Sequence, residues 1–233
     1  MKALIVLAHH EPSSFNAAMA ATASEALIAA GHTVVLSDLY GEDFNPVGDR
    51  RDFLEVGDPG FLKYQTEQQH AQATSTFAPY LAREQARLQE ADLVILQFPM
   101  WWFSVPGILK GWIDKVFAAG FAYGGGRWFE TGRFRERRAI LSLTMSARAN
   151  RWGEDALFGP LEWCLHPIHR GVFNFCGFDT LRPHIVHAPA AMTPAERELE
   201  LSAWSSRCAG LFEESPLPFR QTTDFEGESY RGV

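Results

Sequence analysis

Three stretches of this 233-residue chain combine side chains that could bind a ligand. The first, HHEPSSFN at residues 9–16, places Ser13, Ser14 and Asn16 at the start of an alanine-rich stretch. A helix that begins there presents free backbone N–H groups and the positive end of its dipole, and His9 is placed to reach the same point. The stretch can therefore hold a phosphate, although ordinary helix capping explains the serines equally well.

The second stretch, FPMWWFSVP at residues 98–106, is the most informative. Large apolar side chains stand where a solvent-facing turn would carry polar ones. A planar aromatic ligand stacked on Trp102 or Phe103, with its edge bonded to backbone N–H groups, would explain them, and a flavin ring is the ligand we expect at such a place. A subunit interface or plain core packing are the alternatives.

The third stretch, TMSARANRW at residues 144–152, supplies small side chains that let backbone N–H groups approach a ligand closely. It fits the pyrimidine edge of a flavin. A small, polar sequence is also typical of an ordinary loop, so the stretch has meaning only together with the other two.

Other chemistries lack their defining residues. The chain contains no GxGxxG after its first apolar run, no GxxxxGK[ST] and no GxSxG. Cys164, His166 and His169 lie close together, but Pro167 interrupts a shared helical face and no second ligand pair follows, so we expect no metal.

Composition excludes several further classes. The formal net charge of −7 offers no basic surface for a nucleic acid. No apolar run approaches the roughly 20 residues that a membrane-spanning helix needs, and the apolar start is too short for a signal peptide. The 3 cysteines form no paired CxxC. We therefore expect a reduced, cytoplasmic protein with no membrane insertion.

The periodicity of the chain predicts the elements that position the three stretches. The fold class that we predict is α/β, with a doubly wound, parallel five-stranded sheet, because short apolar strands alternate with helices. A single domain over residues 1–214 and an extended C-terminal tail over residues 215–233 are expected. Residues 40–64 and 121–136 read as long ordered loops, which are often functional. Strands are expected at residues 3–8, 34–37, 92–97, 139–144 and within 181–187, and helices at 15–30, 77–90, 108–119, 155–164 with its continuation, and 194–213.

The chain resembles the NAD(P)H quinone oxidoreductases of the DT-diaphorase type, which are flavodoxin-like flavoproteins. The resemblance runs from Ala3 to about Pro216 and depends on ALIVLAHHEPSSFNAAM, VVLSDLYGEDFNP, EADLVILQFPMWWFSVPGILKGWIDKVF and NFCGF. It implies a homodimer with FAD at sites lined by both subunits, with FMN as the alternative cofactor. It also implies ping-pong hydride transfer from NAD(P)H through the flavin to a quinone.

The resemblance also implies residue roles. The cofactor residues would be His9, Ser14, Phe15, Asn16, Pro99, Met100, Trp101, Trp102, Phe103, Thr144, Met145, Ser146, Ala147 and, at the adenine end, Arg197. The quinone and nicotinamide would lie against Trp102, Phe103, Tyr123 and Phe175, with Phe175 donated by the partner subunit.

The catalytic positions that the resemblance implies are Tyr123, Trp152 and Phe158, and the last two depart from the family. After the fourth strand the family has a tyrosine and a histidine that are thought to stabilise charge on the reduced flavin, and this chain has Trp152 and Phe158 there. Neither can exchange that proton. We therefore expect a more apolar pocket that prefers bulky, hydrophobic quinones. An azo- or nitro-aromatic reductase, a flavin-bearing regulatory subunit of a transport system and a domain that has lost its cofactor remain alternatives.

Overall fold

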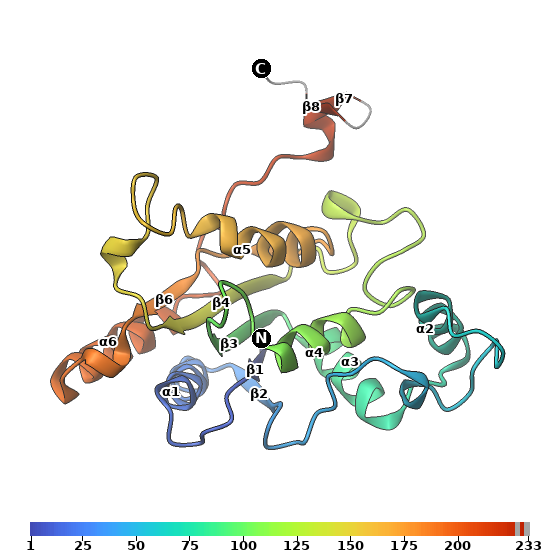
Figure 1. Ribbon diagram of the computed structural model, residues 1–233, viewed down its shortest axis with the longest axis horizontal. Helices are drawn as coiled ribbons and strands as arrows, with labels where there is room; N and C mark the ends of the chain where they lie inside the picture. The colour runs from blue at the N-terminus through green and yellow to red at the C-terminus, as the bar shows by residue number, and fades with distance from the viewer. Residues whose placement is uncertain (227–228, 231–233) are drawn as a thin grey trace.

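A parallel sheet forms the centre of the computed structural model, which describes residues 1–226 and 229–230 (Figure 1). The strands pair in the order β2-β1-β3-β4-β5, and β6 also pairs with β4. The doubly wound parallel sheet that the sequence predicts is therefore confirmed. The strands are β1 (Lys2–Leu7), β2 (Thr33–Asp38), β3 (Leu93–Pro99), β4 (Arg138–Met145), β5 (Asp179–Thr180) and β6 (His184–His187).

The predicted fifth strand is divided in two. β5 pairs with the beginning of β4, and β6 pairs with its end. Pro183 lies between the two pieces and has no N–H group to donate to a ladder, which explains the break.

Helices cover both faces of the sheet. α1 (Phe15–Ala29) and α6 (Pro194–Cys208) lie side by side and share one core with Ile5 and Ile95 (Figure 1). On the other face, Leu4 and Leu96 share a core with the remaining helices. These helices are α2 (Tyr64–Thr74), α3 (Pro79–Glu90), α4 (Gly107–Val116) and α5 (Glu162–Ile168).

Several predicted helix limits were wrong. The helix predicted over residues 155–164 begins only at Glu162, because Gly159 has a φ value of 71°, which a right-handed helix does not allow. α4 and α6 end at Val116 and Cys208, before the predicted residues 119 and 213. The sequence reading missed α2 (Tyr64–Thr74). The predicted helical continuation beyond residue 164 is confirmed by the rest of α5 and by the π-helix η4 (His169–Asn174) that follows it.

The long loop at residues 40–64 is anchored to α4 by a buried ion pair. Lys115 Nζ lies 2.9 Å from Asp52 Oδ1, and both side chains are at most 1% exposed. Tyr64 donates to Asp52 Oδ2 at 2.6 Å, and Tyr80 donates to Asp52 Oδ1. The loop therefore forms a fixed part of the fold.

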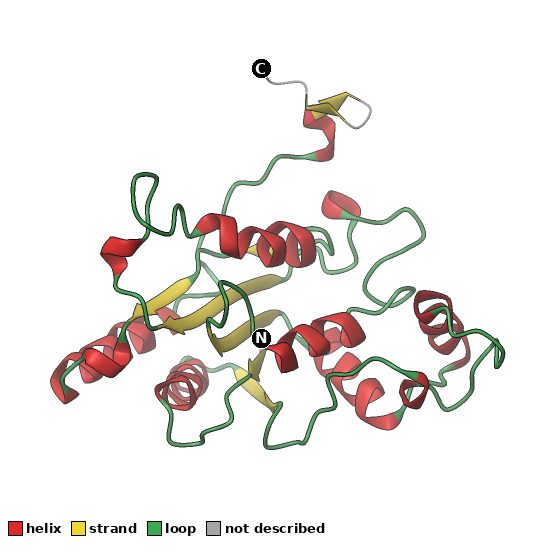
Figure 2. Ribbon diagram, in the orientation of Figure 1, coloured by secondary structure: helices red, strands yellow, loops and turns green. Residues whose placement is uncertain are grey.

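The tail is held to the domain over part of its length. Leu217 N donates to Thr180 O at 2.8 Å, and Glu130 accepts hydrogen bonds from the amide and hydroxyl of Thr222. Figure 2 shows the tail running away from the sheet as a loop before its last short elements. These are a 3₁₀ turn (Thr222–Asp224) and the pair β7 (Phe225–Glu226) and β8 (Ser229–Tyr230), where only extended chain was predicted. Residues 227–228 and 231–233 of the predicted tail lie outside the described residues.

Two buried histidines should make the fold sensitive to acid. Burial lowers the pKa of His169 and of His184 to about 4, well below the ordinary value of about 6.5. Between pH 6.5 and 4 the unfolded chain takes up these protons and the folded chain does not, so stability falls as the pH falls. We expect roughly 2 kcal/mol of loss for each histidine over this window.

Urea unfolding at pH 7 and pH 4.5 measures this loss. Because a leucine cannot take up a proton in either state, His169→Leu should flatten the pH dependence of the unfolding free energy. An unchanged slope in that variant would contradict the assignment.

Candidate functional site

The three candidate ligand-binding stretches lie together at the carboxyl ends of β1, β3 and β4. Leu7 is in register with Gln97, and Pro99 with Thr144, so these strands end at one edge of the sheet. Met100 N donates to Thr144 O at 2.7 Å, which joins the second stretch to the third. In open α/β sheets this edge is where ligands bind.

A buried polar network fixes the first stretch against the third. Asn16 Nδ2 donates to Thr144 Oγ1 at 2.9 Å, and Gln97 Nε2 donates to Asn16 Oδ1 at the same distance. The Asn16 side chain is therefore occupied inside the protein, and what it can offer a ligand is its backbone N–H. Gln97 was missed by sequence reasoning, although an amide in an otherwise apolar strand was a usable signal.

The beginning of α1 can bind an anion. Ser14 caps the helix by accepting from Ala17 N at 3.1 Å. Within the described part of the chain, the backbone N–H groups of Phe15 and Asn16 have no hydrogen-bond partner, as the first turn of a helix requires. His9 Nδ1 accepts from Glu11 N at 3.0 Å, and burial together with His10 lowers the pKa of His9. A neutral His9 would thus carry its proton on Nε2, free to donate.

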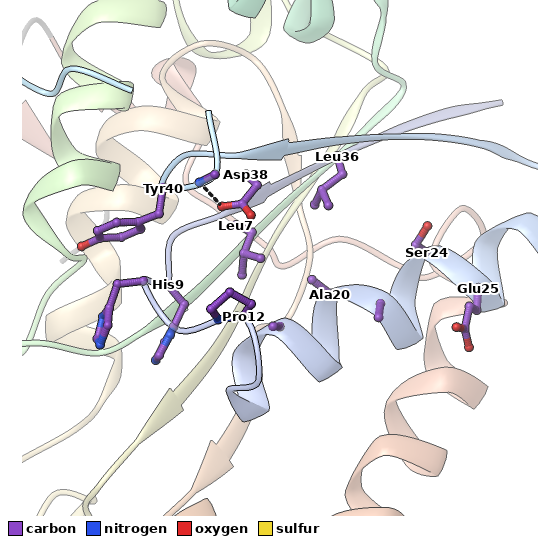
Figure 3. A pocket seen from close by; sticks show the side chains of 13 residues that line it. Leu7, His9, Pro12, Ala20, Ser24, Glu25, Leu36, Asp38 and Tyr40 are labelled. Carbon is purple, nitrogen blue, oxygen red and sulfur yellow. Dashed lines mark hydrogen bonds between the residues drawn. The ribbon is translucent and has the colours of Figure 1, made fainter. Parts of the chain in front are cut away.

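A cleft of about 640 Å³ opens beside this anion site. Figure 3 shows Leu7 and Leu36 of the sheet facing Ala20 of α1 across it, with Tyr40 at one end. His10 connects the cleft to the second stretch, because its ring lies 5.9 Å from Tyr40 and 6.2 Å from Trp101.

The second stretch forms a strained turn. Trp101 and Ser104 exchange both backbone hydrogen bonds at 3.0 Å, and Trp102 and Phe103 between them have φ values of 50° and 59°. This is the geometry of a type I′ turn, in which asparagine and glycine are usual and bulky residues cost about 1–3 kcal/mol. Trp102 is nevertheless 95% exposed. Strain and exposure of a large aromatic side chain together indicate a binding function.

An aromatic cluster joins the second stretch to the loop that follows β4. Phe103 lies 5.7 Å from Trp152 and 5.4 Å from Phe158, and those two rings are 5.2 Å apart, all measured between ring centroids. The cluster brings together the two positions that depart from the family and the turn that should hold the ring of the ligand. Its one polar atom, Trp152 Nε1, is buried without a hydrogen-bond partner.

The remaining residues that were predicted to hold a cofactor lie around the third stretch. Thr144 and Met145 are buried at the end of β4, whereas Ser146 is exposed beside Ala147, whose carbonyl contacts His187 Nδ1 at 3.1 Å. Arg197 lies in the first turn of α6 and donates to Pro189 O at 3.4 Å. A cavity of about 330 Å³ separates the third stretch from this helix.

Tyr123 and Phe175 do not share a cavity with the aromatic turn. Their rings lie 6.1 Å apart and line a separate cavity of about 410 Å³ between α2, α4 and η4. Burial raises the pKa of Tyr123, and its hydroxyl accepts from Gln65 Nε2 at 3.1 Å. Trp102, Phe103 and Trp152 do not line the cavity of Tyr123 and Phe175.

Between residues 1 and 226 and at 229–230, no group of three histidine, cysteine or acidic side chains is placed to hold a metal ion. No helix in this part of the chain is long and apolar enough to cross a membrane.

The sheet order and the binding edge place the protein among the doubly wound α/β proteins that bind nucleotides and flavins at this edge. A family model described as "Flavodoxin-like fold" matches residues 1–208. NAD(P)H dehydrogenase (quinone) 1 of Rattus norvegicus is 40% identical over 97% of this chain and 82% of its own length. Ribosyldihydronicotinamide dehydrogenase (quinone) of Pongo abelii is 38% identical over 93% and 94%.

The chain is also similar to a solved structure from Klebsiella pneumoniae, described as that of a "Putative quinone reductase". It has a TM-score of 0.95 and 33% sequence identity, and the match covers 99% of this chain and 94% of that one. The chain belongs to the flavodoxin-like family and, within it, to the group of the quinone dehydrogenases named above.

Proposed function

We propose that this protein is a flavin-dependent oxidoreductase that passes a hydride from NAD(P)H to a quinone by a ping-pong mechanism. The observation that carries the proposal is the strained, exposed turn at Trp102 and Phe103, which borders the aromatic cluster and the third stretch. The names of the relatives, each a quinone dehydrogenase, support the same reaction.

The groups present at this edge fit a flavin dinucleotide. The aromatic side chains of the turn at Trp102 and Phe103 suit the flat ring system of a flavin. The unpartnered backbone N–H groups at the start of α1 suit its pyrophosphate. When bound, a flavin supplies the electron sink for hydride transfer. Because Arg197 and a cavity lie beyond the third stretch, where an adenine end could be held, we propose FAD rather than FMN.

The chain's own residues would bind and orient the flavin and would exclude water from it. His9, Ser14 and the N–H groups of Phe15 and Asn16 would hold the phosphates. Met100, Trp101, Trp102 and Phe103 would flank one side of the ring system. The backbone N–H groups of Ser146 and Ala147 would donate to its polar edge, as donors in an oxyanion hole do. Pro99, Thr144 and Met145 would support these residues from the strand ends.

We further propose a homodimer. Trp102 is almost fully exposed, and the cavity at Tyr123 and Phe175 lies apart from it within one chain. A second copy would cover Trp102 and bring its Tyr123 and Phe175 to the acceptor. Sedimentation equilibrium should give twice the chain mass of 26.1 kDa, and full activity in a monomer would contradict this arrangement.

The thiols agree with a cytoplasmic protein, which we also propose. Cys164, Cys176 and Cys208 are all free, and burial raises the pKa of the last two to about 12. Such thiols stay protonated and unreactive.

Steady-state kinetics with varied NAD(P)H and varied quinone test the reaction. A ping-pong mechanism gives parallel lines in double-reciprocal plots, because the nucleotide leaves before the quinone binds. Intersecting lines would contradict the ping-pong mechanism. If the protein turned over neither NAD(P)H nor quinone, the proposed oxidoreductase activity would be excluded.

The aromatic cluster should select the acceptor. Because Trp152 and Phe158 replace polar residues of the family with apolar rings, we expect kcat/KM to be about tenfold higher for a bulky hydrophobic quinone than for a small polar one. Phe158→His should reduce this preference. Equal kcat/KM values for the two quinones in the unaltered protein would count against a selective pocket.

A further inference from the structure

The cleft of about 640 Å³ between α1 and β2 lies beside the proposed flavin site, and apart from His9 its lining has no role there. Figure 3 shows Ser24 at one end of the cleft, Leu36 and Asp38 along its side, and Tyr40 at the other end. Leu36 is 46% exposed although it lies within a strand. An open apolar wall between polar groups suits the flat ring of a small ligand.

Asp38, the last residue of β2, lines this cleft with one carboxylate oxygen unused. Its Oδ1 accepts from Gly41 N at 3.0 Å, whereas Oδ2 has no hydrogen-bond partner within the described residues. A Cβ atom at residue 41 would lie 2.7 Å from Oδ2, so the glycine leaves that oxygen uncovered. In dinucleotide-binding α/β proteins, an acidic side chain beyond the first helix accepts a hydrogen bond from the ribose 2′-hydroxyl.

The groups along the cleft follow the order of the parts of a nicotinamide dinucleotide. Leu36 would face the adenine, Asp38 the ribose and Tyr40 the diphosphate. The path continues to the second stretch, because the ring of His10 lies 5.9 Å from Tyr40 and 6.2 Å from Trp101. Only β1 separates β2 from β3, so the carboxyl ends of these two strands are about 10 Å apart, a distance that an extended dinucleotide spans.

The cleft lacks a positive charge that could neutralise a further phosphate. Among the described residues that line it, Asp38 and Glu25 are acidic and none is a lysine or an arginine. NADPH differs from NADH by a phosphate on the same 2′-hydroxyl. That phosphate could not donate to Asp38 and would meet its negative charge, and such a pairing of like charges opposes binding.

We propose that this cleft binds the adenosine end of NADH, and that Asp38 accepts from its ribose and makes the enzyme prefer NADH to NADPH. The adenine would lie between Leu36 and α1, and the hydroxyl of Tyr40 would donate to the diphosphate. The inference rests on the proposed function, since it requires a nicotinamide dinucleotide as the hydride donor. It adds a binding site and a residue that determines coenzyme specificity.

Calorimetry with two nucleotides tests the cleft without turnover. 5′-AMP and adenosine 2′,5′-bisphosphate differ only in the 2′-phosphate, and the protein is loaded with flavin so that the flavin's own site is occupied. We expect 5′-AMP to bind at least tenfold more tightly, roughly the effect of one repulsive charge pair. Failure of the flavin-loaded protein to bind 5′-AMP would overturn the inference.

Three variants locate this binding. Asp38→Asn keeps an oxygen for Gly41 N and removes the charge, so it should narrow the difference between the two nucleotides. Ala21→Phe fills the cleft from an exposed position on α1 and should weaken the binding of both. Glu213→Gln is the matched control, because it removes one negative charge from an exposed residue that does not line the cleft.

Steady-state kinetics relates the cleft to hydride transfer. The donors are NADH, NADPH and reduced nicotinamide riboside, which lacks the adenosine end. We expect kcat/KM for NADH to exceed that for NADPH by about tenfold or more. Ala21→Phe should lower the ratio of kcat/KM for NADH to that for the riboside by about tenfold. A change in folding or in flavin binding does not alter this ratio, because both donors reduce the same flavin.

The outcomes separate the inference from the proposed function. Equal kcat/KM values for NADH and NADPH in the unaltered protein would overturn the inference and leave the proposed function intact. An unchanged ratio of NADH to riboside in Ala21→Phe would do the same. Failure of all three donors to reduce the bound flavin would overturn the proposed function, and the inference with it.

Discussion

Lys115→Met is expected to lower the free energy of unfolding by about 3–5 kcal/mol, the usual cost of removing one partner of a buried ion pair. Lys115 is 1% exposed and donates to Asn45 O at 2.7 Å and to Tyr80 Oη at 2.7 Å, besides its contact with Asp52. Its loss leaves the Asp52 carboxylate buried without a counter-charge and releases the loop at residues 40–64. The cause is the uncompensated charge, since methionine fills a similar volume.

Urea unfolding of paired variants tests this explanation. Lys110→Met is the matched control, because Lys110 pairs with Asp114 on the surface, where both side chains are more than half exposed. That variant should change the unfolding free energy by less than about 1 kcal/mol. Adding Asp52→Asn to Lys115→Met should restore part of the loss. A loss in Lys115→Met no larger than that of the control would contradict the role of the pair.

Asn16→Ala is expected to weaken flavin binding by about 10- to 100-fold. The substitution leaves Thr144 Oγ1 and Gln97 Nε2 without their shared partner in a buried place, a cost of about 1–3 kcal/mol. Part of that cost should appear as loss of the alignment between the first and third stretches, because Asn16 is the side chain that joins them. The backbone N–H of residue 16 remains available to a phosphate.

Fluorescence titration of the apoprotein with FAD measures the effect. Gln69→Ala, which removes an exposed amide from α2, is the control and should leave the dissociation constant unchanged. If Asn16→Ala binds FAD as tightly as the unaltered protein, the buried network does not position the site.

The strands and the binding edge followed from short-range patterns. Residues 3–8 and 92–97 are apolar runs without alternation, which fixes them as central strands buried on both faces. Ser14 and Thr193 mark the starts of α1 and α6 because their side chains cap backbone N–H groups within the next turn. Once parallel strands are established, their carboxyl ends must lie together, so it was predictable that the three candidate stretches meet at one edge of the sheet.

The rest depends on contacts between residues far apart in the chain. The sequence of residues 148–160 does not predict that the rings of Trp152 and Phe158 contact Phe103, because that cluster forms only when two loops meet. The polar helix α2, rich in glutamine, has little apolar periodicity and uses Gln68 to bond the backbone at Asp114 and Ala119. The αL conformation of Trp102 opposes local preference, and a strained turn cannot be read from a sequence that disfavours it.

The most direct test of the proposed reaction is an anaerobic titration of the purified protein with NADH or NADPH and then with a quinone, monitored by the visible absorbance of the flavin. We expect bound flavin, identified as FAD after denaturation, whose absorbance is bleached by one equivalent of NADH or NADPH and restored by one equivalent of a hydrophobic quinone. A flavin-loaded protein that neither nucleotide bleaches would contradict the oxidoreductase, and a protein that binds no flavin on reconstitution would contradict the site itself.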